Sequence, residues 1–289
     1  MRIKNFGGYS LGEYLGGGLY TKVYKGYSFL AKPPYGNPVA IKILYLKGNF
    51  WERNKLLKQF EREASIAMNL EHPNIVKVYN FGRFDSHYAM IMEYIDGKNL
   101  KEYLYEREKW TLELILDICY KIGKGLEYIH KNNIVHKDVK PDNVLISYDF
   151  KVVKLTDFGI AKLPKRFWRK DIFPKSGTVT KFGIISYISP EQSEGNATFQ
   201  SDIYSFGVTM DEIITAKLSI EGKNEEDYFK RIDIRAYRKN TGKQRILCED
   251  LPVPEELKKI IEKATEPDVN LRYENMTELL QNLDKLIIK

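Results

Sequence analysis

The stretch IVHKDVKPDN, residues 134–143, decides the fold that the sequence predicts. It gathers Asp138, Lys140 and Asn143 directly after a helical pattern, and fourteen residues beyond Asn143 the chain reads DFG, residues 157–159. Any one of these acids alone is more often a turn residue or a helix cap. Their occurrence together and in this order indicates a polar site that carries chemistry.

Two short apolar runs, 144–146 and 152–155, lie between these residues and predict a β-hairpin. The hairpin is expected to bring Asp138, Asn143 and Asp157 to one edge. Oxygen-bearing side chains suit a hard cation such as Mg²⁺, which keeps waters and phosphate oxygens as its further ligands. The sequence therefore predicts a magnesium site at this edge.

A lysine stands in an otherwise apolar strand pattern at VAIK, residues 39–42. A buried ammonium needs an anionic partner to stay charged. The helix predicted over roughly 50–70 offers Glu63, which lies on the same face as the apolar stripe of Leu56, Phe60, Ala64 and Ala67. We expect Lys42 to pair with Glu63, with a purely structural ion pair as the alternative to a functional one.

The glycine-rich stretch LGGGLYTKVYKG, residues 15–26, does not match the common phosphate loops that lead into a helix. Counting five residues on from Gly12 gives Gly17, but Gly18 follows it in place of a lysine. The alternation over 22–26 predicts a strand, so a hairpin with a glycine-rich tip is expected. Taken alone, such a tip is either a cover for phosphates or a plain turn.

The chain as a whole is predicted to be an α+β protein of two lobes. Short strands are predicted over 39–46, 75–84 and 88–95, and the join falls near Ile95-Asp96-Gly97. Helical periodicity takes over from about residue 100. It is clearest at Ile115, Ile118, Ile122, Leu126 and Ile129, and again at Leu279, Leu283, Leu286 and Ile287.

Composition narrows the class of protein. Of the 289 residues, 43% are hydrophobic and 29% are charged, as in ordinary globular proteins. The sequence has no apolar run of about eighteen residues, so no segment is expected to span a membrane. Cys119 and Cys248 lie far apart, without metal-ligand neighbours, which favours a thiol-reduced, cytoplasmic protein. The net charge of +7 fits a solvated Lys-rich surface, with nucleic acid, anionic lipid or acidic partners as alternatives.

Together these motifs resemble those of the eukaryotic-like (Hanks-type) Ser/Thr protein kinases, and specifically the bacterial members. The matching elements are LGGGLYTKV, VAIK, Glu63, HKDVKPDN and DFG. They continue with Ser189-Pro190-Glu191 for the A-P-E element, with Asp202 in the next helix, and with Arg272, which is expected to pair with Glu191. The resemblance covers roughly residues 9–286.

The resemblance implies the α+β, two-lobed protein kinase fold in a single domain, 1–289. The β-rich N-lobe, 9–95, is expected to hold the ATP lid and one regulatory helix. The mainly helical C-lobe, 96–289, is expected to hold the catalytic loop, the activation segment and the substrate platform. The implied function is ATP-dependent Ser/Thr phosphorylation of proteins, with autophosphorylation, using ATP and Mg²⁺ or Mn²⁺. A nucleotide-binding pseudokinase scaffold and a kinase-like small-molecule phosphotransferase stay open as alternatives.

The same resemblance assigns roles to the catalytic residues. Lys42 is expected to grip the α- and β-phosphates, and Glu63 to hold Lys42 in place. Asp138 is expected to accept the proton of the attacking hydroxyl or to orient that hydroxyl. Lys140 is expected to neutralise charge on the transferred phosphoryl group. Asn143 and Asp157 are the expected metal ligands.

For the nucleotide, the main chain of 16–22 is expected to cover the phosphates. The carbonyl of Glu93 and the N–H of Ile95 are expected to pair with the adenine edge. The remaining contacts come from Leu15, Gly16, Gly17, Gly18, Val23, Ala40, the gatekeeper-like Met92 and Leu145. For the apolar members of this set, simple core packing is the alternative.

Three positions depart from the family pattern. Thr21 replaces the third glycine, and a β-branched residue disfavours positive φ, so nucleotide affinity is expected to change without being lost. Lys137 replaces the usual arginine and lacks its bidentate fork, so activity is expected to depend less on phosphorylation of the activation segment. Ile184 stands where a threonine usually bonds the catalytic Asp.

Two basic runs, within 162–175 and 231–245, are candidate docking sites for acidic or phosphorylated partners, with a solvated charged face as the alternative. No periodic base-stacking aromatics accompany them, so dedicated nucleic-acid binding is not expected. Bacterial relatives often continue into a membrane anchor or a sensor domain, so the chain could also be the cytoplasmic kinase domain of a longer membrane-anchored protein. The oligomeric state is not predicted.

Overall fold

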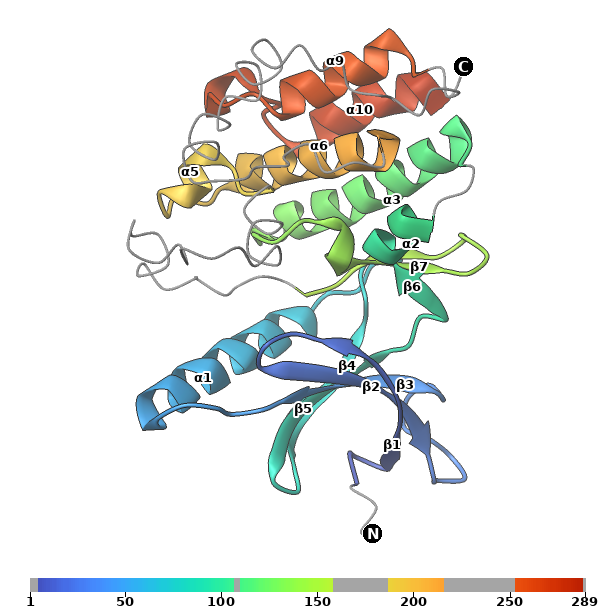
Figure 1. Ribbon diagram of the computed structural model, residues 1–289, viewed down its shortest axis with the longest axis vertical. Coiled ribbons are helices and arrows are strands. Elements are labelled where there is room, and N and C mark those ends of the chain that lie inside the picture. Colours follow the sequence, from blue (N-terminus) through green and yellow to red (C-terminus); the bar gives the residue numbers. More distant parts are fainter. Residues whose placement is uncertain (1–4, 107–109, 158–186, 216–252, 288–289) are drawn as a thin grey trace. The chain divides into compact units, whose positions relative to one another are not determined.

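The computed structural model describes residues 5–106, 110–157, 187–215 and 253–287. The chain divides into two compact units, and most of their helices and strands are labelled in Figure 1. The sheet unit comprises Met1–Lys98 and Ile146–Ala161, and the helical unit comprises Asn99–Leu145 and Lys162–Lys289. The predicted α+β class is confirmed.

The sheet unit is built on a five-stranded antiparallel sheet in the order β1-β2-β3-β5-β4 (Figure 1). A smaller sheet has the order β6-β7-β8. The strands are β1 (Tyr9–Gly17), β2 (Thr21–Ser28), β3 (Val39–Leu44), β4 (Val78–Phe84), β5 (His87–Glu93), β6 (Gly97–Asn99), β7 (Val144–Ser147) and β8 (Val153–Leu155). The predicted hairpin over the glycine-rich stretch is therefore present, with its tip between β1 and β2.

Helix α1, Phe50–Ala67, packs against β4 in the same unit. It begins with a capping box, in which the Asn49 side chain accepts from the Glu52 N–H at 3.0 Å and the Glu52 carboxylate accepts from the Asn49 N–H at 2.9 Å. Three members of the predicted apolar stripe, Phe60, Ala64 and Ala67, are buried. The prediction of a helix with this buried face is confirmed.

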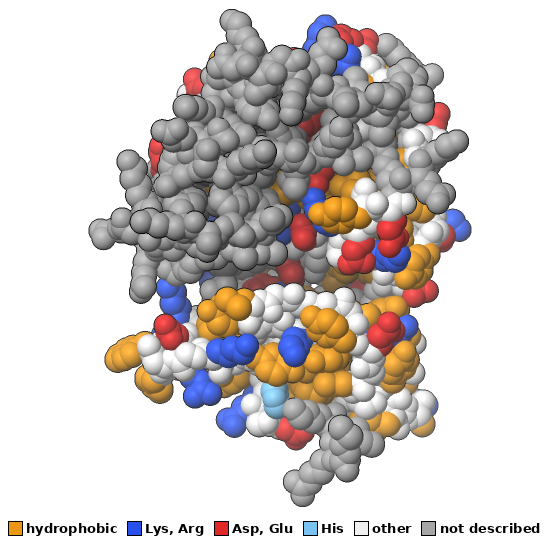
Figure 2. Space-filling view, viewed as in Figure 1, with side chains coloured by type: hydrophobic (Ala, Val, Ile, Leu, Met, Phe, Trp, Pro, Cys, Tyr) orange, Lys and Arg blue, Asp and Glu red, His pale blue; other side chains and the backbone are white. Residues whose placement is uncertain are grey.

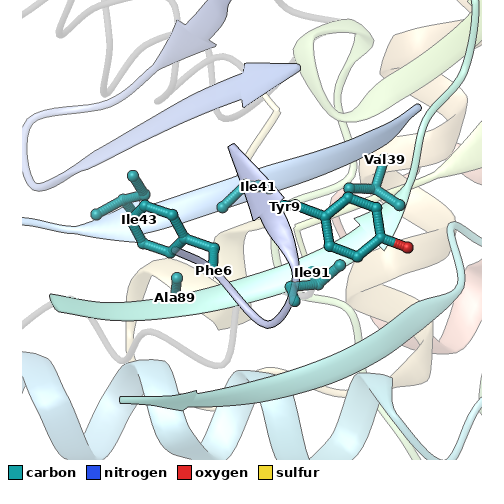
Figure 3. Close-up of a cluster of buried hydrophobic side chains, with 7 residues drawn as sticks. All are labelled: Phe6, Tyr9, Val39, Ile41, Ile43, Ala89 and Ile91. Atoms are coloured by element: carbon teal, nitrogen blue, oxygen red, sulfur yellow. The ribbon is translucent and has the colours of Figure 1, made fainter. Parts of the chain in front are cut away.

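One face of the large sheet carries a hydrophobic cluster (Figure 3), to which β3 and β5 contribute most of the side chains. Its buried members are Phe6, Tyr9, Val39, Ile41, Ile43, Ala89 and Ile91. Because side chains alternate along a strand, the residues between them in β3 and β5 point to the opposite face. That opposite face therefore carries Ala40 and Lys42 from β3 and Met90 and Met92 from β5.

Strand β8 is held in the sheet unit by the segment around Asn74. The Leu155 N–H donates to the Asn74 carbonyl and the Val76 N–H donates to the Leu155 carbonyl, each at 2.9 Å. The Asn74 side-chain amide donates to the Val153 carbonyl at 3.0 Å. These bonds fix the backbone that leads directly into Asp157.

The helical unit is centred on α6, whose residues 201–214 are all buried. Helix α6 lies between α3 and α9, and α10 packs on both α3 and α9 (Figure 1). The elements of the unit are α2 (Leu100–Glu106), α3 (Leu112–Lys131), η1 (Pro141–Asn143), α5 (Pro190–Ser193), α6 (Phe199–Thr215), α9 (Glu255–Ala264), η4 (Val269–Leu271) and α10 (Met276–Ile287). Within the described ranges, no helix combines the length and the apolar character needed to cross a membrane.

The periodic residues predicted from the sequence lie on α3 and α10. The α3 set is buried throughout, as are Leu279 and Leu283 of α10. Ile287, at the end of α10, is exposed. Leu286 is half-buried. The hydrophobic period therefore identified both helices, but its last two positions in α10 do not belong to the buried face.

The predicted pair of Glu191 and Arg272 is formed and joins α5 to the end of η4. Arg272 donates through Nη1 and Nη2 to the two carboxylate oxygens of Glu191 at 2.8 and 2.9 Å. Burial alone raises the pKa of the Glu191 carboxyl, but the bonds from Arg272, Ser201 and Ser189 lower that pKa to about 2. The pair is consequently ionised near neutral pH.

We predict that Gly97→Ala destabilises the protein. A Cβ at this position lies 1.8 Å from the Ile146 carbonyl oxygen, so β6 and β7 must separate to admit it. The expected loss of unfolding free energy is about 2 kcal/mol or more, measured by urea unfolding. Gly82→Ala is the matched control, because a Cβ there meets no atom within 4 Å. Equal stability of the two variants would contradict the close approach at Gly97.

A second prediction concerns acid stability. Arg272→Met leaves the Glu191 carboxylate without its cation, which is expected to cost about 3 kcal/mol of unfolding free energy near neutral pH. Because the folded pKa of Glu191 is below its ordinary value, this contribution is present above about pH 4.3 and is lost as the pH falls toward 2. The difference between wild type and Arg272→Met should therefore shrink on acidification, as measured by urea unfolding.

The control for this experiment is Lys258→Met, which breaks the exposed pair with Glu255. Exposed pairs contribute about 0–1 kcal/mol, so this variant should remain close to wild type at every pH. A difference for Arg272→Met that stays constant from neutral to acidic pH would show that the Glu191 carboxyl does not carry the effect.

Candidate active site

The Lys42 ammonium is clamped between two carboxylates within the sheet unit. Lys42 lies in β3 and is 5% exposed. Its Nζ donates to Oε1 of Glu63, on α1, at 2.7 Å and to Oδ1 of Asp157 at 2.6 Å. The predicted Lys42–Glu63 pair is present, and Asp157 completes a three-charge cluster.

The charge on Lys42 is secured by this arrangement. Burial lowers the pKa of the ammonium, but the carboxylates of Asp157 and Glu63 raise that pKa above its ordinary value by a larger amount. Lys42 is therefore a fixed cation on a sheet face. The Asp157 side chain is 44% exposed, whereas that of Glu63 is 17% exposed. Asp157 is accordingly the more exposed of the two carboxylates.

Asp157 itself lies in the left-handed region, with φ of 57°. Asp and Asn tolerate this conformation better than other non-glycine residues. The preceding strand is anchored by the bonds to Asn74 and by an ion pair of 2.8 Å between Lys154 and Glu93. The rest of the DFG motif, Phe158 and Gly159, lies outside the described residues.

A second cluster gathers around Asp138 in the helical unit. The Lys140 ammonium donates to both oxygens of the Asp138 carboxylate, at 2.9 and 2.8 Å. The Asn143 amide nitrogen donates to Oδ2 and to the main-chain carbonyl of Asp138, each at 2.7 Å. Since these bonds occupy the amide nitrogen, Oδ1 is the Asn143 atom that suits a cation. The sequence predicted these three residues, and the structure brings them together.

The backbone before Asp138 is supported by a buried carboxylate of α6. Asp202, whose side chain is fully buried, accepts from the main-chain N–H groups of His136 at 2.7 Å and Lys137 at 2.8 Å. Nε2 of His130 lies 2.9 Å from the same carboxylate. Lys137 has φ of 69°, a conformation that costs a lysine about 1–2 kcal/mol. The buried carboxylate offsets this cost by fixing the turn that presents Asp138.

Several expected nucleotide contacts share a sheet face with Lys42. The register sets Val23 opposite Lys42, and Ala40 opposite Met92. By the alternation of side chains, Val23, Ala40 and Met92 lie on the same face as the ammonium. Ala40 and Met92 are buried. This face therefore places apolar side chains beside a fixed positive charge.

The glycine-rich hairpin has its tip at residues 18–20. Gly16 has φ of 146°, which favours glycine, while a Cβ there would meet no atom within 4 Å. Thr21 begins β2 opposite Leu44 and lies outside the left-handed region, so its branched side chain strains nothing. The expectation that Thr21 alters the lid thus gains no support from backbone strain.

The remaining expected nucleotide contacts lie at strand ends or between strands. Leu15 is in β1 and is 39% exposed, Gly17 ends β1, and Gly18 follows it. Glu93 ends β5 and Ile95 comes two residues later, both in the sheet unit. Leu145 belongs to β7 and to the helical unit. The contacts of these residues with a nucleotide stay predictions. The metal site shared by Asp157 and Asn143 also stays a prediction, because Asp157 belongs to the sheet unit and Asn143 to the helical unit.

Some sequence predictions fall outside the described residues. These are Ile184, the candidate phosphorylation positions Ser176, Thr178 and Thr180, and both basic runs, 162–175 and 231–245.

On the face shown in Figure 2, hydrophobic side chains of the sheet unit are interspersed with Lys and Arg side chains. Exposed hydrophobic residues of this unit include Tyr14, Leu19, Tyr27, Phe50 and Trp51.

Four supporting interactions were not predicted from the sequence. They are the ion pair between Lys154 and Glu93, the two bonds that Lys101 and Tyr187 make to the buried Glu212, and the bond from Gln192 to the Lys137 carbonyl. Each joins residues far apart in the chain. No periodicity or motif spacing connects such residues, so only the folded structure reveals them.

Comparison with known proteins identifies the family of the chain. The sequence matches the family described as "Protein kinase domain" over residues 9–283. It is 34% identical over 246 residues to "Probable serine/threonine-protein kinase PknB" of Lactococcus lactis, covering 85% of this chain and 37% of that protein. It is 33% identical over 278 residues to "Serine/threonine-protein kinase PrkC" of Bacillus subtilis, covering 94% of this chain and 39% of that protein. The chain thus spans about two fifths of the length of these curated relatives.

A solved structure extends the likeness to three dimensions. The PknI kinase domain of Mycobacterium tuberculosis matches with a TM-score of 0.66 and 21% sequence identity, and the match covers 98% of each chain. At this identity the likeness shows the fold alone. Together with the family match, which runs through almost the whole sequence, it leads to one conclusion: the chain belongs to the protein kinase family and resembles its bacterial Ser/Thr members.

Proposed function

We propose that the chain is an ATP-dependent protein kinase that transfers the γ-phosphoryl group to Ser and Thr hydroxyls and also phosphorylates itself. The observation that carries this proposal is the buried Lys42 ammonium, held between Glu63 and Asp157 at 2.7 and 2.6 Å. A fixed cation beside apolar strand residues suits the phosphates of a nucleotide. Relatives named serine/threonine-protein kinases, which align over most of this chain, support the same activity.

ATP with Mg²⁺, or Mn²⁺ in its place, would supply the phosphoryl group and neutralise part of its charge. Lys42 would bind the α- and β-phosphates, and Glu63 would keep Lys42 in position. Asp157 and Asn143 offer the oxygen atoms that hard cations prefer, Asp157 through a half-exposed carboxylate and Asn143 through Oδ1. The donor set of this chain therefore fits the metal.

Asp138 is the proposed acceptor of the hydroxyl proton. Its carboxylate is aimed by Lys140 and Asn143, which bond both of its oxygens between them. The substrate oxygen would form its bond to the γ-phosphorus while the bond from that phosphorus to the leaving ADP breaks. The hydroxyl proton would pass to the Asp138 carboxylate, or the carboxylate would orient the hydroxyl. Lys140 would then neutralise charge on the transferred group.

The nucleotide would be bound by the expected contacts. Its adenine edge would pair with the main chain of Glu93 and Ile95. The main chain of Gly16, Gly17 and Gly18 would cover the phosphates. The side chains expected against the adenine are those of Leu15, Val23, Ala40, Met92 and Leu145.

We further propose a single kinase domain over 1–289, with an N-lobe of 9–95 and a C-lobe of 96–289. Protein substrates are proposed from the relatives named above. Acidic or phosphorylated docking partners are proposed from the positive charge of the two basic runs. A cytoplasmic location, alone or as the kinase domain of a longer membrane-anchored protein, rests on the low cysteine content and on the relatives' greater length.

The direct prediction concerns Asp138→Asn, which keeps the size of the side chain and removes its ability to take a proton. With radiolabelled ATP and Mg²⁺, we expect label transfer to the chain itself and to a generic basic protein to fall by at least about 100-fold. ATP affinity should stay close to wild type, because Asp138 makes no proposed contact with the nucleotide in the ground state. Asp117→Asn on α3 is the matched control, since Asp117 pairs only with its neighbour Lys121 along the helix in the contacts resolved.

The same assay separates the alternatives. Labelling of no protein by wild type, under either Mg²⁺ or Mn²⁺, combined with measurable ATP binding, would favour the nucleotide-binding scaffold. Label that appears only on an added small molecule would favour the small-molecule phosphotransferase. Protein labelling that Asp138→Asn leaves intact would contradict the role of the carboxylate.

A further prediction concerns the segment between DFG and Ser189. Lys137 stands where an arginine would pair bidentately with a phosphorylated residue, so the dependence on that phosphorylation should be weak. Changing Ser176, Thr178 and Thr180 together to alanine should leave activity within about 3-fold of wild type in the same assay, because a lysine makes only a point-charge contact. Near-total loss of transfer would refute this.

A further inference from the structure

Gln192 makes a bond that nothing in the proposed chemistry uses. It lies in α5, next to Glu191, and its Nε2 donates to the main-chain carbonyl of Lys137 at 2.8 Å. Lys137 immediately precedes Asp138 and is held in the left-handed region at φ of 69°. The Gln192 side chain of α5 thus bonds Lys137, the residue in the left-handed region beside the proposed proton acceptor Asp138.

The peptide group between Lys137 and Asp138 is bonded at both of its ends. Its carbonyl accepts from Gln192, and its N–H, which belongs to Asp138, donates to Nδ1 of His136 at 3.3 Å. Because a peptide group is planar, bonds to both ends fix the orientation of the whole plane. The direction in which Asp138 leaves the backbone follows from that plane.

Helix α5 does not need Gln192 for its own stability. Its first turn is capped by Ser189, which accepts from the Gln192 N–H, and Glu191 is anchored by Arg272. The Gln192 amide oxygen is buried and accepts no hydrogen bond from any residue that the structure describes. The side chain therefore leaves one polar atom unsatisfied while its nitrogen reaches Lys137, which points to a role at that carbonyl.

We propose that Gln192 is a positioning residue, which orients the Asp138 carboxylate by fixing the Lys137–Asp138 peptide. The proposal rests on the kinase activity proposed above. It places the control of Asp138 partly in α5, the first described helix after residues 158–186. Lys140 and Asn143 bond the Asp138 carboxylate directly. Gln192 instead fixes the orientation of the backbone from which that carboxylate extends.

The test compares Gln192→Met with Gln192→Lys. Methionine has a similar length but no donor, whereas lysine restores a donor that can reach the carbonyl. We expect kcat to fall about 10-fold in Gln192→Met, with KM for ATP and Mg-ATP affinity unchanged, because a misaimed base slows only the transfer step. Gln192→Lys should recover to within about 3-fold of wild type. Ser193→Ala is the control, because it removes only a bond within α5, to the Pro190 carbonyl.

Amide hydrogen exchange over residues 136–140 provides a readout that is independent of activity. Exchange should rise in Gln192→Met and stay at the wild-type level in Ser193→Ala and Gln192→Lys. If exchange rises but wild type transfers no phosphoryl group, the proposed function fails while the bond from Gln192 is upheld. If wild type is active and Gln192→Met changes neither kcat nor exchange, or if Gln192→Lys is as impaired as Gln192→Met, the positioning role is overturned.

Discussion

The charge on Lys42, buried in a β-sheet, is the constraint on which the chemistry of the sheet unit depends. An ammonium with 5% exposure is stable only if carboxylates replace its lost water. The carboxylate of Glu63, on α1, and that of Asp157, just beyond β8, both form ion pairs with the ammonium. The capped start of α1 and the anchoring of β8 to Asn74 therefore serve one purpose, which is to keep two anions beside one cation.

The helical unit solves the opposite problem, because it must hold a carboxylate in a defined direction. Asp138 stands on a loop with a lysine in the left-handed region, and such a conformation persists only when its surroundings hold it. The Asp202 carboxylate accepts hydrogen bonds from two backbone N–H groups of this loop, and the Gln192 amide donates a hydrogen bond to one of its backbone carbonyls. The buried α6, which supplies Asp202, is thus the rigid base of the loop.

Different physical signals explain what could be predicted from the sequence. Glu63 was placed on the buried face of α1 by helical period alone, and the hairpin β7–β8 by two apolar runs. The pairing of Glu191 with Arg272 required the family resemblance, because nothing local relates residues so far apart. The bond from Lys154 to Glu93 and that from Gln192 to Lys137 could not be predicted, since each depends on how elements pack after they form.

The most direct test of the account is a crystal structure of the chain with Mg²⁺ and a non-hydrolysable ATP analogue. We expect Lys42 to keep its bond to Glu63 and to bond a phosphate oxygen, while the Asp157 carboxylate and the Asn143 amide oxygen bind the cation. It would be contradicted by an analogue whose phosphates lie away from Lys42, with the ammonium still bonded to both carboxylates.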